Sequence, residues 1–170
     1  MRQESLLKQA VLAKTQGDYA LAEKYFRDCL IIAPRNAEAL RELGFIRYGI
    51  HKDYHDAKDL FIQSLQIEDC FTGHFYLAMV LARMDEIEEA EKEYLKALEQ
   101  AHSDGDRGLG ETEYADFLGI NGRLDEALKH FQEALAVCPD YERAKKRHRA
   151  LLQVIAHNDA PNAGEMPPQR

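Results

Sequence analysis

Residues 17–26 read GDYALAEKYF, and this stretch decides the fold because versions of it recur three more times. The later copies read KDYHDAKDLF at 52–61, DEIEEAEKEY at 85–94 and GRLDEALKHF at 122–131. Their alanines, at positions 22, 57, 90 and 127, lie 35, 33 and 37 residues apart. A period of about 20 to 50 residues is typical of stacked supersecondary units. We therefore expect an array of repeated units and not one globule.

Each copy carries the same signature of three residues. The alanine is followed four positions later by an aromatic residue, and three positions after that by a small residue. This spacing places all three on one face of a helix, where the small residues let a neighbouring helix approach closely. The aromatic residues are Phe26, Phe61, Tyr94 and Phe131, and the small ones are Cys29, Ser64, Ala97 and Ala134.

A second helical pattern precedes each copy and has its own column of small residues. This column consists of Ala10, Gly44, Ala78 and Ala115. Turns between the two patterns are expected at Gly17, Lys52, Asp85 and Gly122. The chain is also rich in Ala, Leu, Glu and Lys, which favour helices, and poor in Val and Thr. Each unit is thus predicted to be a hairpin of two helices in an all-α protein.

This order of residues resembles the tetratricopeptide repeat (TPR) family, whose unit of about 34 residues ends with a proline. The resemblance implies an α-solenoid, a right-handed superhelical array of antiparallel helix hairpins. Four repeats are expected at 3–36, 37–70, 71–104 and 108–141. Pro34 and Pro139 close the first and last repeats. The chain departs from the family pattern, which has bulky residues at these positions, at Gln9, Arg47, His74 and Glu111.

The segments outside the four repeats have distinct compositions. Residues 142–157 carry an apolar stripe and are predicted to form a capping helix, which completes a TPR domain over 1–157. The stripe consists of Ala144, His148, Leu151 and Ile155. Residues 158–170 have little to bury and are predicted to be a disordered tail. Residues 104–110, DGDRGLG, are expected to be a connector with hinge-like glycines.

Composition and charge exclude several classes of function. The 170 residues carry a net charge of −8, from 22 Lys and Arg against 30 Asp and Glu. Binding of nucleic acid or an anionic membrane normally needs a basic surface, so neither partner is expected. The charged N-terminal residues do not resemble a signal peptide, which predicts a cytoplasmic protein. Three widely spaced cysteines indicate neither a disulfide framework nor a thiolate zinc site.

The sequence contains no recognisable catalytic motif, so we expect no enzyme activity, no cofactor and no metal site. His51 and His55 are spaced like a metal-binding pair, but the predicted turn at 52–53 separates them. A basic run stands out in the capping helix. It is interpreted as the solvated side of that helix or, alternatively, as a docking patch for an acidic partner. Its residues are Arg143, Lys145, Lys146, Arg147 and Arg149.

In TPR arrays the first helices of successive repeats line a concave groove that binds partner segments, and the resemblance implies the same here. The residues at groove positions are Leu7, Val11, Arg41, Phe45, Tyr48, Phe75, Tyr76, Met79 and Arg83, with Thr112, Glu113 and Asp116 in the fourth repeat. Aromatic residues, Met and Arg are enriched at binding hot spots. The alternative is that some of these side chains pack between hairpins. Replacing Phe45, Phe75 and Met79 by Ala is expected to abolish binding without unfolding.

The leading prediction is an adaptor or scaffold that binds a peptide or helical segment of another protein. The alternative is a small chaperone for secretion substrates, similar to those of type III secretion. RNA-binding pentatricopeptide arrays need a basic groove, which this chain lacks. One TPR subclass grips the acidic tail of heat-shock chaperones through Lys, Arg and Asn residues, and that partner is not expected here. Its five positions are occupied by Leu7, Val11, Glu42, Thr72 and Tyr76. Self-association is left open.

Overall fold

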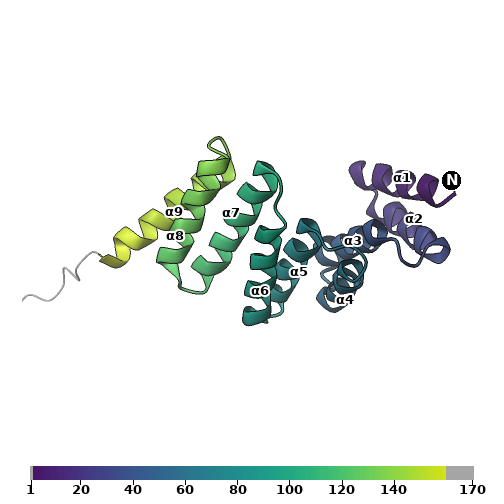
Figure 1. The fold of residues 1–170 in the computed structure, drawn as a ribbon, viewed down its shortest axis with the longest axis horizontal. Coiled ribbons are helices and arrows are strands. Elements are labelled where there is room, and N and C mark those ends of the chain that lie inside the picture. The colour runs from purple at the N-terminus through teal and green to yellow at the C-terminus, as the bar shows by residue number, and fades with distance from the viewer. Residues whose placement is uncertain (1, 160–170) are drawn as a thin grey trace, which may run out of the picture. The chain divides into compact units, whose positions relative to one another are not determined.

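The computed structural model describes residues 2–159, and every regular element within that range is a helix (Figure 1). The predicted all-α fold is therefore confirmed. None of the described helices is both long enough and apolar enough to cross a membrane. The helices are α1 (Arg2–Thr15), α2 (Tyr19–Ile32), α3 (Ala37–Ile46), α4 (Tyr54–Leu65), α5 (Phe71–Arg83), α6 (Ile87–Glu99), α7 (Asp104–Ile120), α8 (Leu124–Val137) and α9 (Glu142–Asp159), with a π-helical segment η1 (Arg47–His51) after α3.

The chain divides into two compact units, with the boundary between Gln100 and Ala101. The first unit contains α1 to α6, and each of these helices packs against the next one along the chain. In the second unit α7 and α8 form a hairpin, and α9 packs against both (Figure 1). Packing between neighbours in sequence is the pattern expected of stacked repeats, where each hairpin buries its apolar face on the next element.

The small residues predicted to form the helix seams are buried, as expected. All four signature alanines have no exposed surface, and the four aromatic residues that follow them are at most 4% exposed. Gly44 shows why a small residue is needed. A Cβ atom at this position would lie 3.0 Å from the ring of Phe61. The close approach of α3 and α4 therefore depends on the absence of a side chain at Gly44.

The segment η1 is a feature that the repeat pattern did not predict. Ala57 comes thirteen positions after Gly44, whereas Ala22 comes only twelve after Ala10. A π-helical turn holds one more residue than an α-helical turn, so η1 absorbs the extra position. The segment ends at His51 and is capped by Lys52, which has a left-handed φ of 59°.

The prediction that residues 104–110 form a flexible connector is wrong, because α7 begins at Asp104. Ser103 caps this helix, with its hydroxyl accepting from the backbone N–H of Asp106 at 3.0 Å. Gly108 allows close packing, since a Cβ atom there would lie 2.9 Å from the Sγ atom of Cys138. The glycines of this stretch therefore belong to a helix, and Gly108 makes room for the chain after α8.

The predicted capping helix is present as α9, which extends two residues beyond its expected end at 157. Ala144 and Leu151 of its apolar stripe are buried, and His148 and Ile155 are half-buried. The ring of His148 lies edge-on to Phe131, with 6.5 Å between the ring centroids. Residues 160–170 of the predicted tail lie outside the described residues.

Candidate binding site on the first helices

The predicted groove residues of the first three repeats all lie in the first unit, on α1, on α3 with η1, and on α5. Arg83 is exposed, Phe75 is buried, and the other seven are half-buried. We use the term first-helix surface for the accessible members of this set. They are Leu7, Val11, Arg41, Phe45, Tyr48, Tyr76, Met79 and Arg83.

The aromatic residues of this surface pack on one another as well as facing solvent. Tyr76 is in the middle of the group, with its ring centroid 5.4 Å from Phe45, 5.7 Å from Phe61 and 5.3 Å from Phe75. Burial raises the pKa of the Tyr76 hydroxyl, and the charge of Glu42 raises it further. The hydroxyl therefore stays protonated at neutral pH and can donate a hydrogen bond to a partner.

Phe75 is a packing residue, so the expectation that it lines an open groove is wrong. Its side chain is only 4% exposed and stacks on Phe71, with 5.3 Å between the ring centroids. Removing a buried phenyl ring costs about 3–5 kcal/mol of stability. A variant that includes Phe75→Ala would therefore mix unfolding with loss of binding.

An open recess of about 470 Å³ lies along α1 and reaches one residue of α3. Leu7 and Val11 form part of its floor together with Leu12, which is 57% exposed. Sequence analysis missed Leu12 because it lies one residue off the predicted helical face. The remaining lining residues are polar or charged and consist of Glu4, Lys8, Thr15 and Glu38. The result is an apolar recess with a charged rim.

The cations nearest to the aromatic group are already paired within the chain. The Lys14 ammonium contacts Glu42 at 2.5 Å and lies 5.3 Å from the centre of the Phe45 ring. Arg41 bonds to Glu68 at 2.9 Å. Arg83 donates a hydrogen bond to the hydroxyl oxygen of Tyr48, which raises the pKa of Arg83 and keeps it charged. This part of the surface is therefore suited to apolar contacts more than to binding a strongly acidic segment.

In the second unit, the residues that the fourth repeat was expected to contribute are buried or paired with arginines of α9. Thr112 is fully buried and donates a hydrogen bond to the backbone carbonyl of Gly108 at 2.7 Å. Glu113 pairs with Arg143, and Asp116 pairs with Arg147 at 2.8 Å. Thr112 and Glu113 therefore line no open groove, whereas Asp116 borders a recess of about 270 Å³ between α7, α8 and α9.

These contacts also account for much of the predicted basic patch. Arg143 and Arg147 are paired as described above, and Lys145 is paired with Glu142 at 2.9 Å. Lys146 and Arg149 are exposed. Most of the basic run thus neutralises acids of its own unit, which agrees with the first of the two interpretations of this helix.

Comparison with known proteins identifies the repeat. The family described as tetratricopeptide repeat matches residues 3–36. The first repeat matches this family, and the solved structures that resemble the chain share the fold of its repeat arrays. No curated protein matches the chain.

Three solved structures illustrate how widely this TPR fold is shared. A MamA protein has a TM-score of 0.70 at 15% identity, with 98% of each chain covered. YrrB, described as a TPR protein with an unusual peptide-binding site, has a TM-score of 0.69 at 19% identity, with 91% of this chain and 78% of that chain covered. The Cut9-Hcn1 hetero-tetramer of the APC/C has a TM-score of 0.81 at 16% identity over 89% of the present chain, which spans only 30% of the length of the matched chain.

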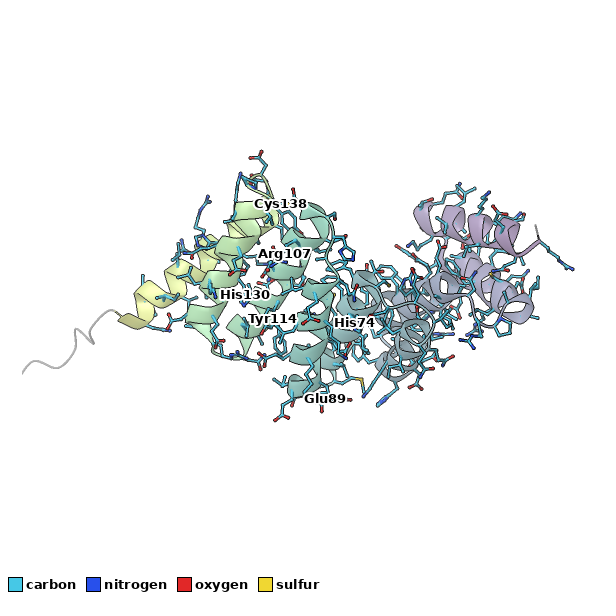
Figure 2. All side chains as sticks on the ribbon, viewed as in Figure 1. His74, Glu89, Arg107, Tyr114, His130 and Cys138 are labelled. Carbon is cyan, nitrogen blue, oxygen red and sulfur yellow. The ribbon has the colours of Figure 1, made fainter. Side chains whose placement is uncertain are left out.

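Two hairpins contain a pair of ionisable residues, one buried and one half-buried, in place of an apolar contact. Figure 2 labels the histidines of the two pairs, His74 and His130. In the third repeat, His74 lies 2.5 Å from Glu93 and 2.6 Å from Asp69. In the fourth, Glu111 on the first helix lies 2.7 Å from His130 on the second helix. The acid and the histidine have thus exchanged helices relative to the third repeat. The corresponding positions of the second repeat are Leu40 and Leu60. His74 and Glu111, the two departures from the family pattern, are therefore explained by partners on the second helix.

The His74 pair predicts that the first unit is more stable in mild acid than in alkali. Burial lowers the pKa of His74, but the hydrogen bonds and charges of Glu93 and Asp69 outweigh it and leave this pKa raised above 6.5. Burial raises the pKa of Glu93, but His74 and Lys96 leave it lowered below 4.5. The stabilisation is therefore complete between pH 4.5 and 6.5, falls as the pH rises through the folded-state value of His74, and falls in acid as Glu93 is protonated.

Urea unfolding of the protein at a series of pH values checks this prediction. The free energy of unfolding should decrease from about pH 6 to about pH 8.5, and the His74→Leu variant should show a smaller decrease. Equal pH dependence in both proteins would show that the His74 pair does not contribute.

Proposed function

We propose that the protein is a non-enzymatic interaction module whose first-helix surface binds a peptide or helical segment of another protein. The observation that carries this proposal is the apolar recess on α1, which has a volume of about 470 Å³ and contains the accessible side chain of Leu12. An amphipathic segment binds such a surface by placing apolar anchors into the recess, and charged side chains at the rim set its orientation.

The aromatic group beside α1 supports the same function. Phe45, Tyr76 and Met79 are half-buried, so a partner can contact them without opening the hairpins. Large aromatic side chains that are already held in place lose little conformational freedom on binding, which makes them suitable anchors. The internal pairing of Lys14 and Arg41 supports the expectation that the acidic tail of heat-shock chaperones is not the partner.

A single substitution at the recess tests the proposal. Leu12→Asp places a charge among Leu7 and Val11, and we expect partners captured by affinity purification from the native organism to be lost. The dissociation constant of an isolated partner, measured by calorimetry, should rise at least about tenfold. Since Leu12 is 57% exposed, the fold should be retained, which circular dichroism can verify.

The matched control is Ile31→Asp on α2, a second helix of a hairpin, where the side chain is 78% exposed. This variant should keep the partners of the unmodified protein. If Leu12→Asp also keeps them at full affinity, the interface lies elsewhere.

The same apolar recess also fits a small chaperone for secretion substrates. That function requires the captured partner to depend on this protein for its solubility. A partner that is equally soluble when expressed alone identifies an adaptor, and one that aggregates alone identifies a chaperone.

A further inference from the structure

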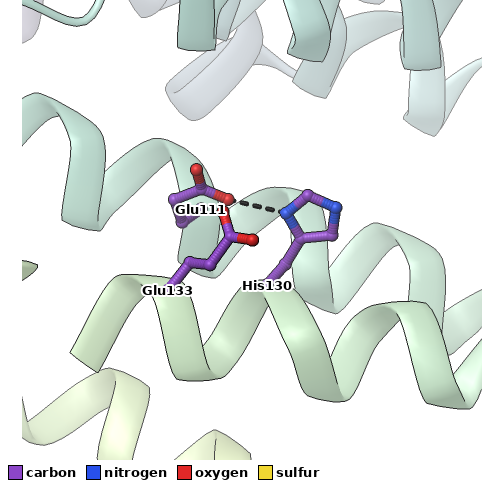
Figure 3. Close-up of side chains that lie close together, drawn as sticks. All are labelled: Glu111, His130 and Glu133. Carbon is purple, nitrogen blue, oxygen red and sulfur yellow. Dashed lines mark hydrogen bonds and ion pairs between the residues drawn. The ribbon is translucent and has the colours of Figure 1, made fainter. Parts of the chain in front are cut away.

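We propose that Glu111, His130 and Glu133 form a binding site for a divalent transition-metal ion, of which Zn²⁺ is the type, in the fourth repeat (Figure 3). The proposal is independent of the first-helix surface, because all three residues lie in the second unit.

The three side chains come from the two helices of one hairpin. Glu111 lies on α7, while His130 and Glu133 are three residues apart on α8 and so share a face of that helix. One oxygen from each carboxylate and one imidazole nitrogen all lie within 4.8 Å of one another. Figure 3 shows the two carboxylates next to each other, with the imidazole beside Glu111. Small side-chain rotations would bring these donor atoms to the distances found around a bound metal.

The environment of Glu111 calls for a cation. Its side chain is only 1% exposed, and the partly exposed carboxylate of Glu133 lies close by, so a buried negative charge has a second one beside it. Such an arrangement is unfavourable unless a positive charge is near. His130 contacts Glu111 through Nδ1 at 2.7 Å. A metal ion would replace a proton at this nitrogen and neutralise both carboxylates.

The third repeat serves as an internal comparison. His74, Glu93 and Lys96 occupy the positions that correspond to Glu111, His130 and Glu133. There the chain supplies its own cation, because the Lys96 ammonium bonds to Glu93 at 2.8 Å. In the fourth repeat the corresponding residue is an acid. The exchange of lysine for glutamate turns a self-neutralised cluster into a set of three metal donors.

Two cations among the described residues compete for this place. The Nε atom of Arg107 lies 3.5 Å from Glu111, and the Lys129 ammonium lies 3.9 Å from Glu133, with side chains that are 47% and 73% exposed. Contacts of these lengths are weak, and exposed side chains can turn into solvent as a metal enters. Tyr114 lies edge-on to His130, with 4.6 Å between the ring centroids, and helps to fix the imidazole.

The donor set indicates the class of metal. One imidazole nitrogen and two carboxylate oxygens suit Zn²⁺ and similar borderline ions better than Ca²⁺ or Mg²⁺, which prefer oxygen alone. Three protein ligands leave the fourth position of a tetrahedral ion for water or for a donor from a partner protein. Because Nδ1 must lose its proton to bind the metal, affinity should fall in acid.

Calorimetric titration of the full chain with Zn²⁺, after removal of metal by a chelator, tests the site. We expect one ion per chain at about pH 7.5 and much weaker binding at about pH 5.5. Co²⁺ should bind with the visible absorption of a four-coordinate ion. Glu133→Gln should weaken binding by at least about tenfold, since even loss of a group that only supports a ligand has that effect.

Glu133→Gln is the first variant to make because this side chain is 42% exposed and its loss should not unfold the hairpin. His130→Gln is the second variant, and both should retain the helical circular dichroism spectrum. The control is Glu126→Gln, which removes an exposed acid from the same helix and should leave Zn²⁺ affinity unchanged. Absence of binding at neutral pH, or equal affinity in all three variants, would overturn the proposal.

Discussion

Replacement of Phe61 by alanine should lower the free energy of unfolding of the first unit by about 3–5 kcal/mol. The Phe61 ring is fully buried, stacks on Tyr76 and fills the space left open at Gly44. Its removal leaves a cavity between α3, α4 and α5 that these helices cannot close, because their spacing is set by buried small residues on either side. Urea unfolding followed by circular dichroism measures the loss.

The control for this prediction is Ile31→Ala, which also removes an apolar side chain from a second helix. Ile31 is 78% exposed, so the change in stability should stay within about 0.5 kcal/mol. A similarly small effect of Phe61→Ala would mean that the helices can slide together, and that the small-residue seam does not determine their spacing.

Removal of the buried carboxylate of Glu111 should destabilise the second unit strongly, whereas removal of the whole pair should not. Glu111→Ala leaves His130 and Arg107 without their partner. Breaking a buried ion pair costs about 3–5 kcal/mol, and the lower end applies here because His130 is 20% exposed. The double variant Glu111→Leu with His130→Leu copies Leu40 and Leu60 of the second repeat. It should be neutral or more stable by about 1–4 kcal/mol.

Chemical unfolding in the presence of a chelator measures both variants without any contribution from bound metal. The coupling free energy follows from the double variant and the two matching single variants, Glu111→Leu and His130→Leu. The matched control is Asp125→Asn, which removes an exposed acid from the first turn of α8. If the double variant loses as much stability as the two single variants together, the two residues stabilise the hairpin independently and the charge pair is not the reason for their presence.

The fold could be predicted from the sequence because the residues that define it recur in register. Ala22, Phe26 and Cys29 lie on one helical face, and the same pattern appears in every hairpin. Recurrence separates residues that pack from those that vary by chance. In the structure these recurring residues are buried in the core. They recur because only small residues at the seam positions allow the helices to pack so closely.

The site was harder to predict because burial depends on contacts between different hairpins. Phe75 occupies a groove position in the repeat pattern, yet it is covered by its neighbours. Leu12 lies one residue off the expected face and is open to solvent. The Glu111 and His130 pair was also missed, because the two residues are nineteen positions apart and neither carries a signal of the contact by itself. Only a comparison of their positions between repeats could have suggested it.

The π-helical segment η1 bears on how this chain can change over evolution. A gain of one residue would normally rotate everything after it by about 100° around the helix axis and destroy the seams. Here the wider turn takes up the added residue before Lys52, so Ala57 and Phe61 remain in the core. A repeat array that absorbs length changes in this way can acquire insertions and deletions in its first helices, and so alter the surface they present, without losing the packing of its second helices.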